Sequence, residues 1–271
     1  MSPLSPNTPA GARSSEHAKQ EVAAASLDQA TRPSTVAAAG KGGTGKSTLL
    51  ISLAACLARS ATVVLVDLDI DNASTLRWSL LRRGVRGVPP ITVIKPEGGE
   101  APVATLERAL DLADAVDGQS IVLVDLPGRP RRDLPTDLWQ RLDLVYVPLE
   151  ASLMVAGATK RLLEGYRQDG ANGPCIRPIV NRWPTERRMA DAVTALGDGI
   201  VAPVSIKAYV AHADAYAAGL GVTELNPQHK SADDIRRLAA DMRGVLRGIS
   251  ESQQTDRWTL LRAASGGTHN E

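Results

Sequence analysis

The chain contains 271 residues, of which 43% are hydrophobic and only 3% aromatic, with no phenylalanine. This length predicts one or two domains with a sizeable core, and the scarcity of aromatic rings argues against proteins that stack single-stranded bases on them. The 31 basic and 30 acidic residues nearly cancel, which excludes a uniformly basic nucleic-acid binder but not a local basic patch. The two cysteines, Cys56 and Cys175, cannot build a disulfide framework or a four-cysteine zinc site.

The composition divides the chain into three parts. Residues 1–33 are rich in Ser, Pro and Ala without periodic apolar residues, so we expect a disordered or partly helical arm. Residues 34–249 carry one continuous strand–helix pattern, which predicts a single α/β domain, and residues 250–271 are expected to form a flexible tail. No apolar run approaches the roughly 18 residues of a membrane span, and the N-terminus lacks the features of a secretory signal. We therefore expect a cytoplasmic protein.

Apolar runs alternate with helix-length segments through the middle of the chain. The runs VVLV and IVLV lack polar alternation, which is typical of strands buried on both faces of a parallel sheet. We expect strands at Ser34–Ala39, Thr62–Leu68, Ile91–Lys95, Ser120–Asp125, Leu144–Val147, Ile176–Val180 and Ile200–Val204. We expect helices at Lys46–Arg59, Asn72–Arg83, Pro102–Val116, Ala151–Arg167, Thr185–Leu196, Lys207–Ala218 and Ala232–Arg247. The pattern predicts an α/β fold, a single doubly wound, mainly parallel sheet with helices on both faces and ligands at the carboxyl ends of its strands.

A glycine-rich loop follows the first predicted strand. Residues 40–47, GKGGTGKS, match the phosphate-binding pattern G-x-x-x-x-G-K-[ST] in full and stand between an apolar strand and a helix. Glycines let backbone N–H groups point at phosphate oxygens, and the helix N-terminus adds partial positive charge. Lys46 is expected to neutralise the β- and γ-phosphates, Ser47 to ligate Mg²⁺, and Thr48 to reach the α-phosphate. The expected nucleotide-binding residues here are Gly42, Gly43, Thr44, Gly45, Lys46, Ser47 and Thr48.

Carboxylates end two more of the predicted strands. Asp67 and Asp69 are two positions apart, so both side chains can face the same side of the sheet. Asp125 ends the strand IVLV, where P-loop proteins carry an aspartate that holds Mg²⁺ through water. Asp71 is expected to cap the helix that begins at Asn72.

The run K-G-G-T-G-K-S resembles the deviant phosphate loop of the ParA/MinD family of ATPases, closest to the ParA-type partition ATPases. The resemblance extends from about residue 34 to 248 and includes Ala213–Glu224, which is similar to the family segment A-x-x-x-G-x-x-V-x-E. It implies that residues 34–249 form a P-loop ATPase domain, and that the protein is a slow, Mg²⁺-dependent, partner-stimulated ATPase that forms a homodimer on ATP. In that dimer Lys41 would reach the partner subunit's nucleotide, and the catalytic residues would be Lys41, Lys46 and Asp69.

The same resemblance implies further roles around the nucleotide. Asp69 would position or activate the attacking water, and Asp67 would lie near Mg²⁺ with Ser47 and Asp125. Ile70-Asp71 stands where the family has Pro-Gln, which leaves the conformation after Asp69 open. Asn181 would bond the adenine edge, which suits an amide that both donates and accepts, and Pro203 would begin the loop that closes over the base. The chain has no N-K-x-D element of guanine-specific GTPases here, which favours ATP.

Basic residues gather on segments that contain few acids. Residues 72–96 contain no acid but carry Arg77, Arg82, Arg83, Arg86 and Lys95. A further group contains Arg182, Arg187 and Arg188. The resemblance implies that the ATP-bound dimer binds DNA non-specifically through its phosphates, which needs no base readout. The DNA-binding candidates are Arg187, Arg188, Lys207, Arg236, Arg243 and Arg247.

A plasmid or chromosome partition ATPase, nucleoid-associated and stimulated by a centromere-binding or cargo adaptor protein, is the favoured interpretation. Two alternatives share the same nucleotide chemistry. One is an ATPase that positions another cargo, such as a conjugation or transfer complex or a polar assembly. The other is a MinD-like membrane-associated ATPase, which needs an amphipathic C-terminal anchor, whereas the tail offers only the apolar group Trp258–Leu261 and so predicts no stable membrane anchor.

Overall fold

The structure is a computed structural model that describes residues 32–128, 133–167, 173–196, 202 and 204–265. All of its helices and strands belong to one compact unit, Pro33–Glu271. The arm predicted at residues 1–33 therefore lies almost entirely outside the described residues, and so does Pro203.

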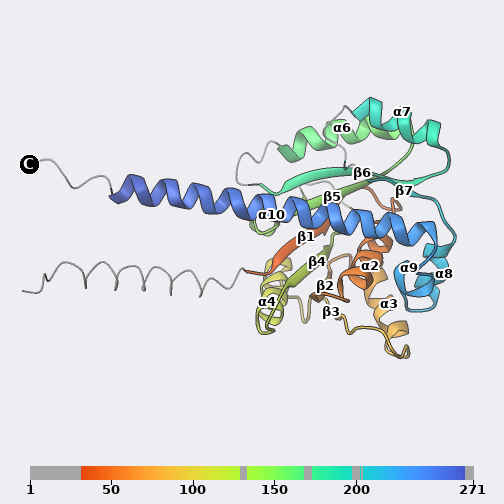
Figure 1. The fold of residues 1–271 in the computed structure, drawn as a ribbon, viewed down its shortest axis with the longest axis horizontal. Coiled ribbons are helices and arrows are strands. Elements are labelled where there is room, and N and C mark those ends of the chain that lie inside the picture. Colours follow the sequence, from red (N-terminus) through yellow and green to blue (C-terminus); the bar gives the residue numbers. More distant parts are fainter. Residues whose placement is uncertain (1–31, 129–132, 168–172, 197–201, 203, 266–271) are drawn as a thin grey trace, which may run out of the picture. The chain divides into compact units, whose positions relative to one another are not determined.

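Within the described residues, one seven-stranded sheet with strand order β3-β2-β4-β1-β5-β6-β7 forms the centre of the unit (Figure 1). Its strands are β1 Ser34–Ala38, β2 Thr62–Asp67, β3 Thr92–Ile94, β4 Ser120–Asp125, β5 Leu144–Glu150, β6 Cys175–Trp183 and β7 Ile206–Lys207. Every neighbouring pair is parallel. All the carboxyl ends therefore lie along one edge, called the carboxyl edge below.

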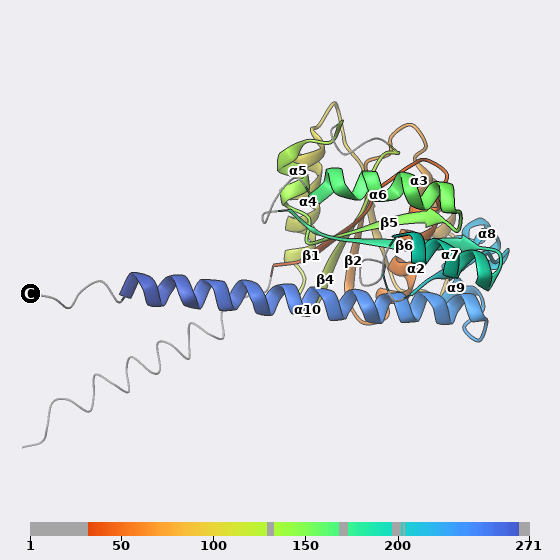
Figure 2. The ribbon, with the colours of Figure 1, turned by 90° about the horizontal axis from the view of Figure 1, so that it is seen from above.

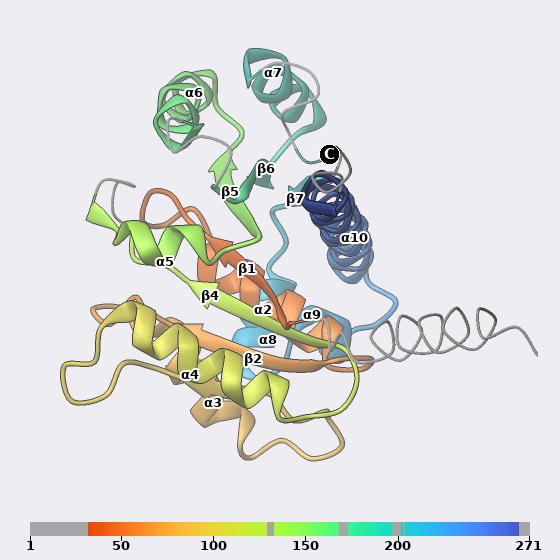
Figure 3. The same ribbon diagram turned by 90° about the vertical axis from the view of Figure 1, so that its left-hand side faces the viewer.

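Helices cover both faces of the sheet. They are α2 Lys46–Leu57, α3 Ser74–Arg82, α4 Pro102–Asp114, α5 Thr136–Gln140, α6 Leu153–Arg167, α7 Glu186–Leu196, α8 Ala211–Ala217, α9 Val222–Leu225 and α10 Lys230–Ser265. One hydrophobic core contains side chains of α2, α3, α8, α9 and α10, and the other contains side chains of α4, α5, α6 and α7. Figure 2 shows α10 on one side of the strands and α4, α5 and α6 on the other. Figure 3 shows α6 and α7 packed beside each other near β5 and β6. The predicted doubly wound α/β fold is confirmed.

The strand predicted at Ile200–Val204 is wrong in the part that is described, because Ala202 and Val204 lie outside any strand and the last strand is β7, Ile206–Lys207. The apolar residues that suggested a strand here are apolar because they are buried. Ala202, Val204 and Ile206 alternate along the chain and all lie in the core, and Ala202 N donates to Pro178 O of β6. The segment thus approaches β6 before it pairs as a strand.

The last helix is much longer than predicted. It was expected to end at Arg247, but α10 spans 36 residues and continues to Ser265, through most of the segment expected to be a flexible tail. No glycine or proline interrupts residues 249–265, and Gly266-Gly267 follows, so local propensity allows the helix to continue. The part of the chain that the structure describes holds no helix both long and apolar enough to span a bilayer.

A buried ion pair joins α3 to α9. Arg82 and Glu224 expose 7% and 2% of their side chains, and the two guanidinium nitrogens donate to the two carboxylate oxygens at 2.8 Å. Arg82 also donates to Gly219 O at 3.2 Å and Pro89 O at 2.8 Å. Gly219 comes so close that an added Cβ would lie 2.6 Å from Arg82 N. Arg82, which sequence reasoning grouped with the basic residues of 72–96, is therefore a structural residue.

Removal of Glu224 is expected to destabilise the protein strongly, because it leaves the Arg82 charge buried without a partner. We expect Glu224→Ala to lower the free energy of unfolding by about 3–5 kcal/mol, measured by urea denaturation. Glu107→Ala is the matched control, because it breaks the half-exposed Arg141–Glu107 pair and should cost about 0–1 kcal/mol. Equally small losses of unfolding free energy in both variants would contradict the structural role assigned to the Arg82–Glu224 pair.

Candidate functional site

The phosphate loop joins β1 to α2 at the carboxyl edge. Gly43 and Gly45 have φ of 81° and 90°, in the left-handed region that glycine adopts without strain. Gly45 is the N-cap of α2, so the free N–H groups of the first helical turn begin directly after it. A loop of this shape at a helix N-terminus is an anion-binding site.

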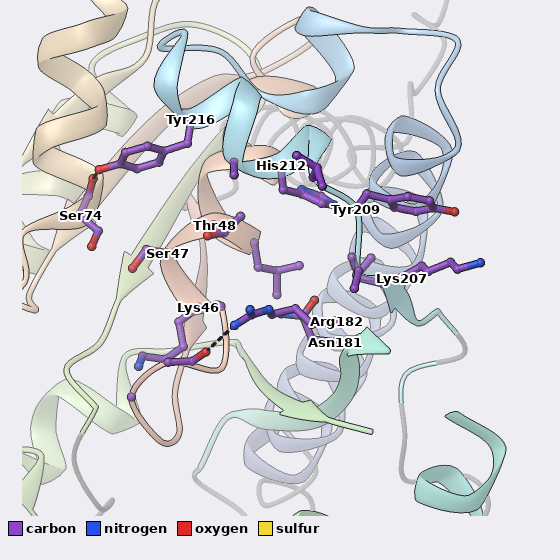
Figure 4. A pocket seen from close by; sticks show the side chains of 18 of the residues that line it. Lys46, Ser47, Thr48, Ser74, Asn181, Arg182, Lys207, Tyr209, His212 and Tyr216 are labelled. Carbon is purple, nitrogen blue, oxygen red and sulfur yellow. Dashed lines mark hydrogen bonds between the residues drawn. The ribbon is translucent and has the colours of Figure 1, made fainter. Parts of the chain in front are cut away.

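An open pocket of ≈ 830 Å³ lies above this loop (Figure 4). Its walls come from four parts of the chain: the loop with the start of α2, the β2–α3 connection, the end of β6, and the segment from β7 through α8. Beyond the loop and α2 they are lined by Asp69, Asn72, Ser74, Asn181, Arg182, Ile206, Lys207, Ala208, Tyr209, Val210, His212, Ala213 and Tyr216. The structure thus brings the predicted residues Lys46, Asp69 and Asn181 to one pocket, whose volume suits a small-molecule ligand.

Lys46 is buried within the loop. Its side chain is 5% exposed and its Nζ donates to Lys41 O at 3.4 Å. Thr44 Oγ1 donates to the same carbonyl at 3.0 Å. The loop therefore holds the Lys46 ammonium near its own backbone, while the Lys41 side chain is exposed.

Three predicted carboxylates are buried at the carboxyl edge. Asp67 and Asp125 pair in register on β2 and β4 and are 1% and 0% exposed, and Asp69 is 7% exposed. Both oxygens of Asp125, and Oδ1 of Asp67, have no hydrogen-bond partner. Burial raises the pKa of Asp125 to about 7, the nearby Ser47 hydroxyl opposes this rise, and the Asp67 charge adds to it.

These unpartnered oxygens fit a hydrated cation. Buried carboxylate oxygens without a donor are costly, and a divalent ion would satisfy them directly or through its water. In the residues described, no cluster of three or more His, Cys, Asp or Glu side chains could hold a metal by itself. Mg²⁺ does not need one, because it is commonly bound by one or two carboxylates together with phosphate oxygens and water.

Asp67 and Asp69 both accept hydrogen bonds from the β2–α3 connection and the start of α3. Leu76 N, in the first turn of α3, donates to Asp67 Oδ2 at 3.0 Å, and Asn72 Nδ2 donates to Asp69 Oδ2 at 2.9 Å. The prediction that Asp71 caps a helix beginning at Asn72 is wrong. The helix begins at Ser74, and Ala73 occupies the N-cap position without a side-chain hydrogen bond. The carboxylate of Asp67, at the end of β2, accepts the hydrogen bond from the first turn of the helix instead.

The far wall of the pocket contains residues that sequence reasoning missed. Tyr216 in α8 donates to Ser74 O at 2.8 Å, which links this wall to the β2–α3 connection. His212 Nδ1 lies 3.4 Å from Ser52 Oγ in α2, and burial lowers the pKa of this histidine. Their spacing matches no sequence motif for a binding site, and the contacts span about 140 to 160 positions of the chain, so local patterns carry no signal for them.

The end of β6 contacts the phosphate loop. Asn181 is 4% exposed, and its Nδ2 donates to Thr44 O at 2.7 Å. The next residue, Arg182, donates from Nη1 to Gly43 O at 3.1 Å. Arg182 was grouped with Arg187 and Arg188 by sequence alone, and nothing in the sequence indicated that its side chain turns toward the loop.

The DNA-binding candidates differ in their exposure and in the partners that their side chains already have. Arg187 and Arg188 on α7 and Arg247 on α10 are exposed. Arg236 pairs with Asp233 at 2.7 Å, and Arg243 donates to Ser60 Oγ at 2.6 Å. The Lys207 ammonium lies 5.2 Å from the centre of the Trp183 ring and 6.0 Å from that of Tyr209. Lys207 is also one of the residues that line the pocket.

A family model described as the CobQ/CobB/MinD/ParA nucleotide binding domain matches residues 35–254. The chain belongs to this family. The match begins in β1, includes the phosphate loop and all three buried carboxylates, and ends within α10. The expected membership of the ParA/MinD ATPases is confirmed.

Individual relatives within this family are distant. The Maintenance of carboxysome distribution protein A of Gloeobacter kilaueensis is 27% identical over 215 residues, which cover 75% of this chain and 90% of that protein. A ParA family ATPase from Chlorobium tepidum is 21% identical with a TM-score of 0.56, covering 78% of this chain and 99% of that one. The cell division ATPase MinD of Pyrococcus furiosus is 16% identical with a TM-score of 0.59, over 78% and 99% of the two chains. At such identities the two structures show the shared fold alone.

The buried Asp125 carboxyl is expected to make the nucleotide-free protein less stable as the pH rises. Burial raises its pKa from 3.8 to about 7, so the folded state holds the proton more tightly. This stabilisation is present at acid pH and is lost as the pH rises through about 7. The Asp125→Asn variant cannot titrate, so we expect it to gain about 1–3 kcal/mol over the parent at about pH 8.

Urea unfolding with EDTA at about pH 5 and about pH 8 measures this difference, which should be smaller at the lower pH. Asp111→Asn, which changes an exposed carboxylate of α4, is the matched control and should leave the pH dependence as it is. A parent–variant difference that is the same at both pH values would contradict the prediction.

Proposed function

We propose that this protein is a ParA-like ATPase that binds Mg²⁺–ATP in the pocket, dimerises on ATP, binds DNA non-specifically and hydrolyses ATP when a partner stimulates it. The observation that carries the proposal is the phosphate loop with two lysines beside three buried carboxylates. Lys46 is turned into the loop and Lys41 is exposed. Asp125 and Asp67 offer oxygens without partners.

The proposed chemistry assigns each side chain one task. The Lys46 ammonium leaves the Lys41 carbonyl and binds the β- and γ-phosphate oxygens, which gain negative charge in the transition state. The Ser47 hydroxyl would be a ligand of Mg²⁺, and Asp67 and Asp125 would hold the water of the ion, which would supply further charge neutralisation when bound. Asp69, oriented by the Asn72 amide, positions the attacking water. Asn181 faces the base, and Lys41 acts on the nucleotide of the partner subunit.

Exposed apolar side chains support the proposed dimer. Ile70 follows β2 and is 66% exposed, while Leu153 and Met154 follow β5 and are 62% and 83% exposed. All three therefore come after strands that end at the carboxyl edge, where Lys41 is also exposed. Large exposed apolar side chains at one edge of the molecule suit a protein interface. A second copy closing over this edge would cover them and bring its own Lys41 to the nucleotide.

Partition of a plasmid or chromosome on the nucleoid, with a centromere-binding or cargo adaptor protein as the stimulating partner, is the proposed role. The Gloeobacter relative favours a second candidate, because its name concerns carboxysome distribution. An ATPase that positions a cargo other than DNA would use the same site. The two candidates share the nucleotide and DNA chemistry and differ in the adaptor.

The nucleotide chemistry predicts separate effects on binding and hydrolysis. Lys46→Ala removes a charged donor and should weaken ATP binding about 10- to 100-fold, measured by calorimetry. Asp69→Ala should bind ATP as the parent does but hydrolyse it about 100- to 10,000-fold more slowly, measured by phosphate release. Lys160→Ala, an exposed lysine of α6, should change neither. Parent-like ATP binding by Lys46→Ala would be evidence against the assigned pocket.

DNA binding is expected only with ATP and through phosphates. The variant Arg187→Ala/Arg188→Ala should bind non-specific duplex DNA more weakly, and the slope of log affinity against log salt should fall by about one for each phosphate that the variant no longer neutralises. Arg108→Ala is the control, because Arg108 on α4 is ion-paired with Glu100. Gel shifts with ATP, with each variant made in the Asp69→Ala background, measure the DNA affinity and its salt dependence. Absence of ATP-dependent binding by the parent at low salt would overturn the DNA role.

A further inference from the structure

Strand β6 carries a bulge where it reaches the pocket. Asn181 pairs with Ile206 and Trp183 pairs with Lys207, so Arg182 is an extra residue that no residue of β7 opposes. Arg182 has φ of 55°, in the left-handed region that bulky residues seldom adopt. Bulges commonly re-aim side chains next to functional sites. The backbone conformation of Arg182 is therefore strained. Strain of this kind persists only where surrounding contacts hold the residue in place, and it is often found at binding sites.

The bulge turns two consecutive side chains toward the same loop. In a regular strand, neighbouring side chains point to opposite faces of the sheet. Here Asn181 Nδ2 donates to Thr44 O at 2.7 Å and Arg182 Nη1 donates to Gly43 O at 3.1 Å. Figure 4 shows both side chains reaching from β6 toward the phosphate loop. Two neighbouring carbonyls of the loop are thus held by two neighbouring residues of one strand.

Holding these carbonyls fixes the direction of the N–H groups that follow them. In a planar trans peptide the C=O and the next N–H point in opposite directions. The bond to Gly43 O therefore orients the Thr44 N–H, and the bond to Thr44 O orients the Gly45 N–H. Backbone N–H groups that converge on one point are what such a loop offers to phosphate. An added Cβ on Gly45 would lie 2.6 Å from Asn181 Nδ2, so the loop and β6 are in close contact.

We propose that Arg182 is a positioning residue for nucleotide binding. It holds the Gly43–Thr44 peptide plane in its binding-ready orientation before the nucleotide arrives. The inference rests on the proposed function, in which the pocket binds Mg²⁺–ATP. The proposal separates Arg182 from Arg187 and Arg188, which are exposed on α7 and for which no hydrogen bond to the loop is recorded. A phosphate bound by the backbone is common to ADP and ATP, so Arg182 acts on both nucleotides equally.

Three substitutions at this position test the proposal. Arg182→Ala should weaken binding of both Mg²⁺–ADP and Mg²⁺–ATP by the same factor, about three- to tenfold, with kcat at saturating ATP unchanged. Arg182→Lys keeps a donor and should recover part of the affinity. Arg182→Gly removes the donor but suits a φ of 55°, so its melting temperature without nucleotide should equal or exceed that of the parent while its affinity falls as in Arg182→Ala. A residue that only supports the fold would not raise stability and lower affinity together.

Arg187→Ala is the matched control, since it removes an exposed arginine and should leave nucleotide affinity unchanged. Parent-like affinity of Arg182→Ala for both nucleotides would overturn the proposal. So would a loss confined to ATP, which would mean a direct contact with the γ-phosphate, or a loss of DNA binding alone, which would return Arg182 to the group of Arg187. If the parent itself binds neither nucleotide while Lys46→Ala matches it, the proposed function fails, and with it this inference.

Discussion

The parallel direction of every strand pair brings the chemistry of this protein to one edge of the sheet. At that edge β1 continues into the phosphate loop, and β2 and β4 end in Asp67 and Asp125, whose positions pair across the two strands. The loop has to turn several N–H groups toward one point while its carbonyls find donors elsewhere. Glycines provide the left-handed conformations, the start of α2 provides the next N–H groups, and β6 provides donors for two carbonyls.

The walls of the pocket are coupled through groups that also serve the fold. Asp67 accepts from the first turn of α3, so a cation near Asp67 acts on the carboxylate that holds that helix. The bond from Tyr216 to Ser74 joins α8 to the same connection. Behind it, the buried Arg82–Glu224 pair ties α3 to α9. Both oxygens of the Glu224 carboxylate in this pair accept hydrogen bonds, whereas both oxygens of Asp125 and Oδ1 of Asp67 have no donor, although they are buried as well.

Local sequence patterns were sufficient for the parts of the structure that depend on local causes. Buried strands are apolar throughout, and the phosphate loop needs a fixed set of glycines and lysines, so β2, β4 and the loop were predicted within a residue or two. The features that sequence reasoning missed depend on distant contacts. In the sequence Arg82 has the pattern of an exposed basic residue, and only the fold places Glu224 beside it. Arg182 has the same pattern, and only the bulge in β6 brings its side chain to the phosphate loop. The short helices α5 and α9 contain five and four residues, too few for a helical period to be visible.

The proposed mechanism requires that ATP bound at this loop closes two copies of the chain over their carboxyl edges. Sedimentation velocity of the Asp69→Ala protein, whose hydrolysis is blocked, measures this closure. We expect a monomer with Mg²⁺–ADP, a dimer with Mg²⁺–ATP, and a monomer with Mg²⁺–ATP when Lys41→Ala is added. A protein that stays monomeric with Mg²⁺–ATP, or that forms the same dimer with either nucleotide and without Lys41, would contradict the mechanism.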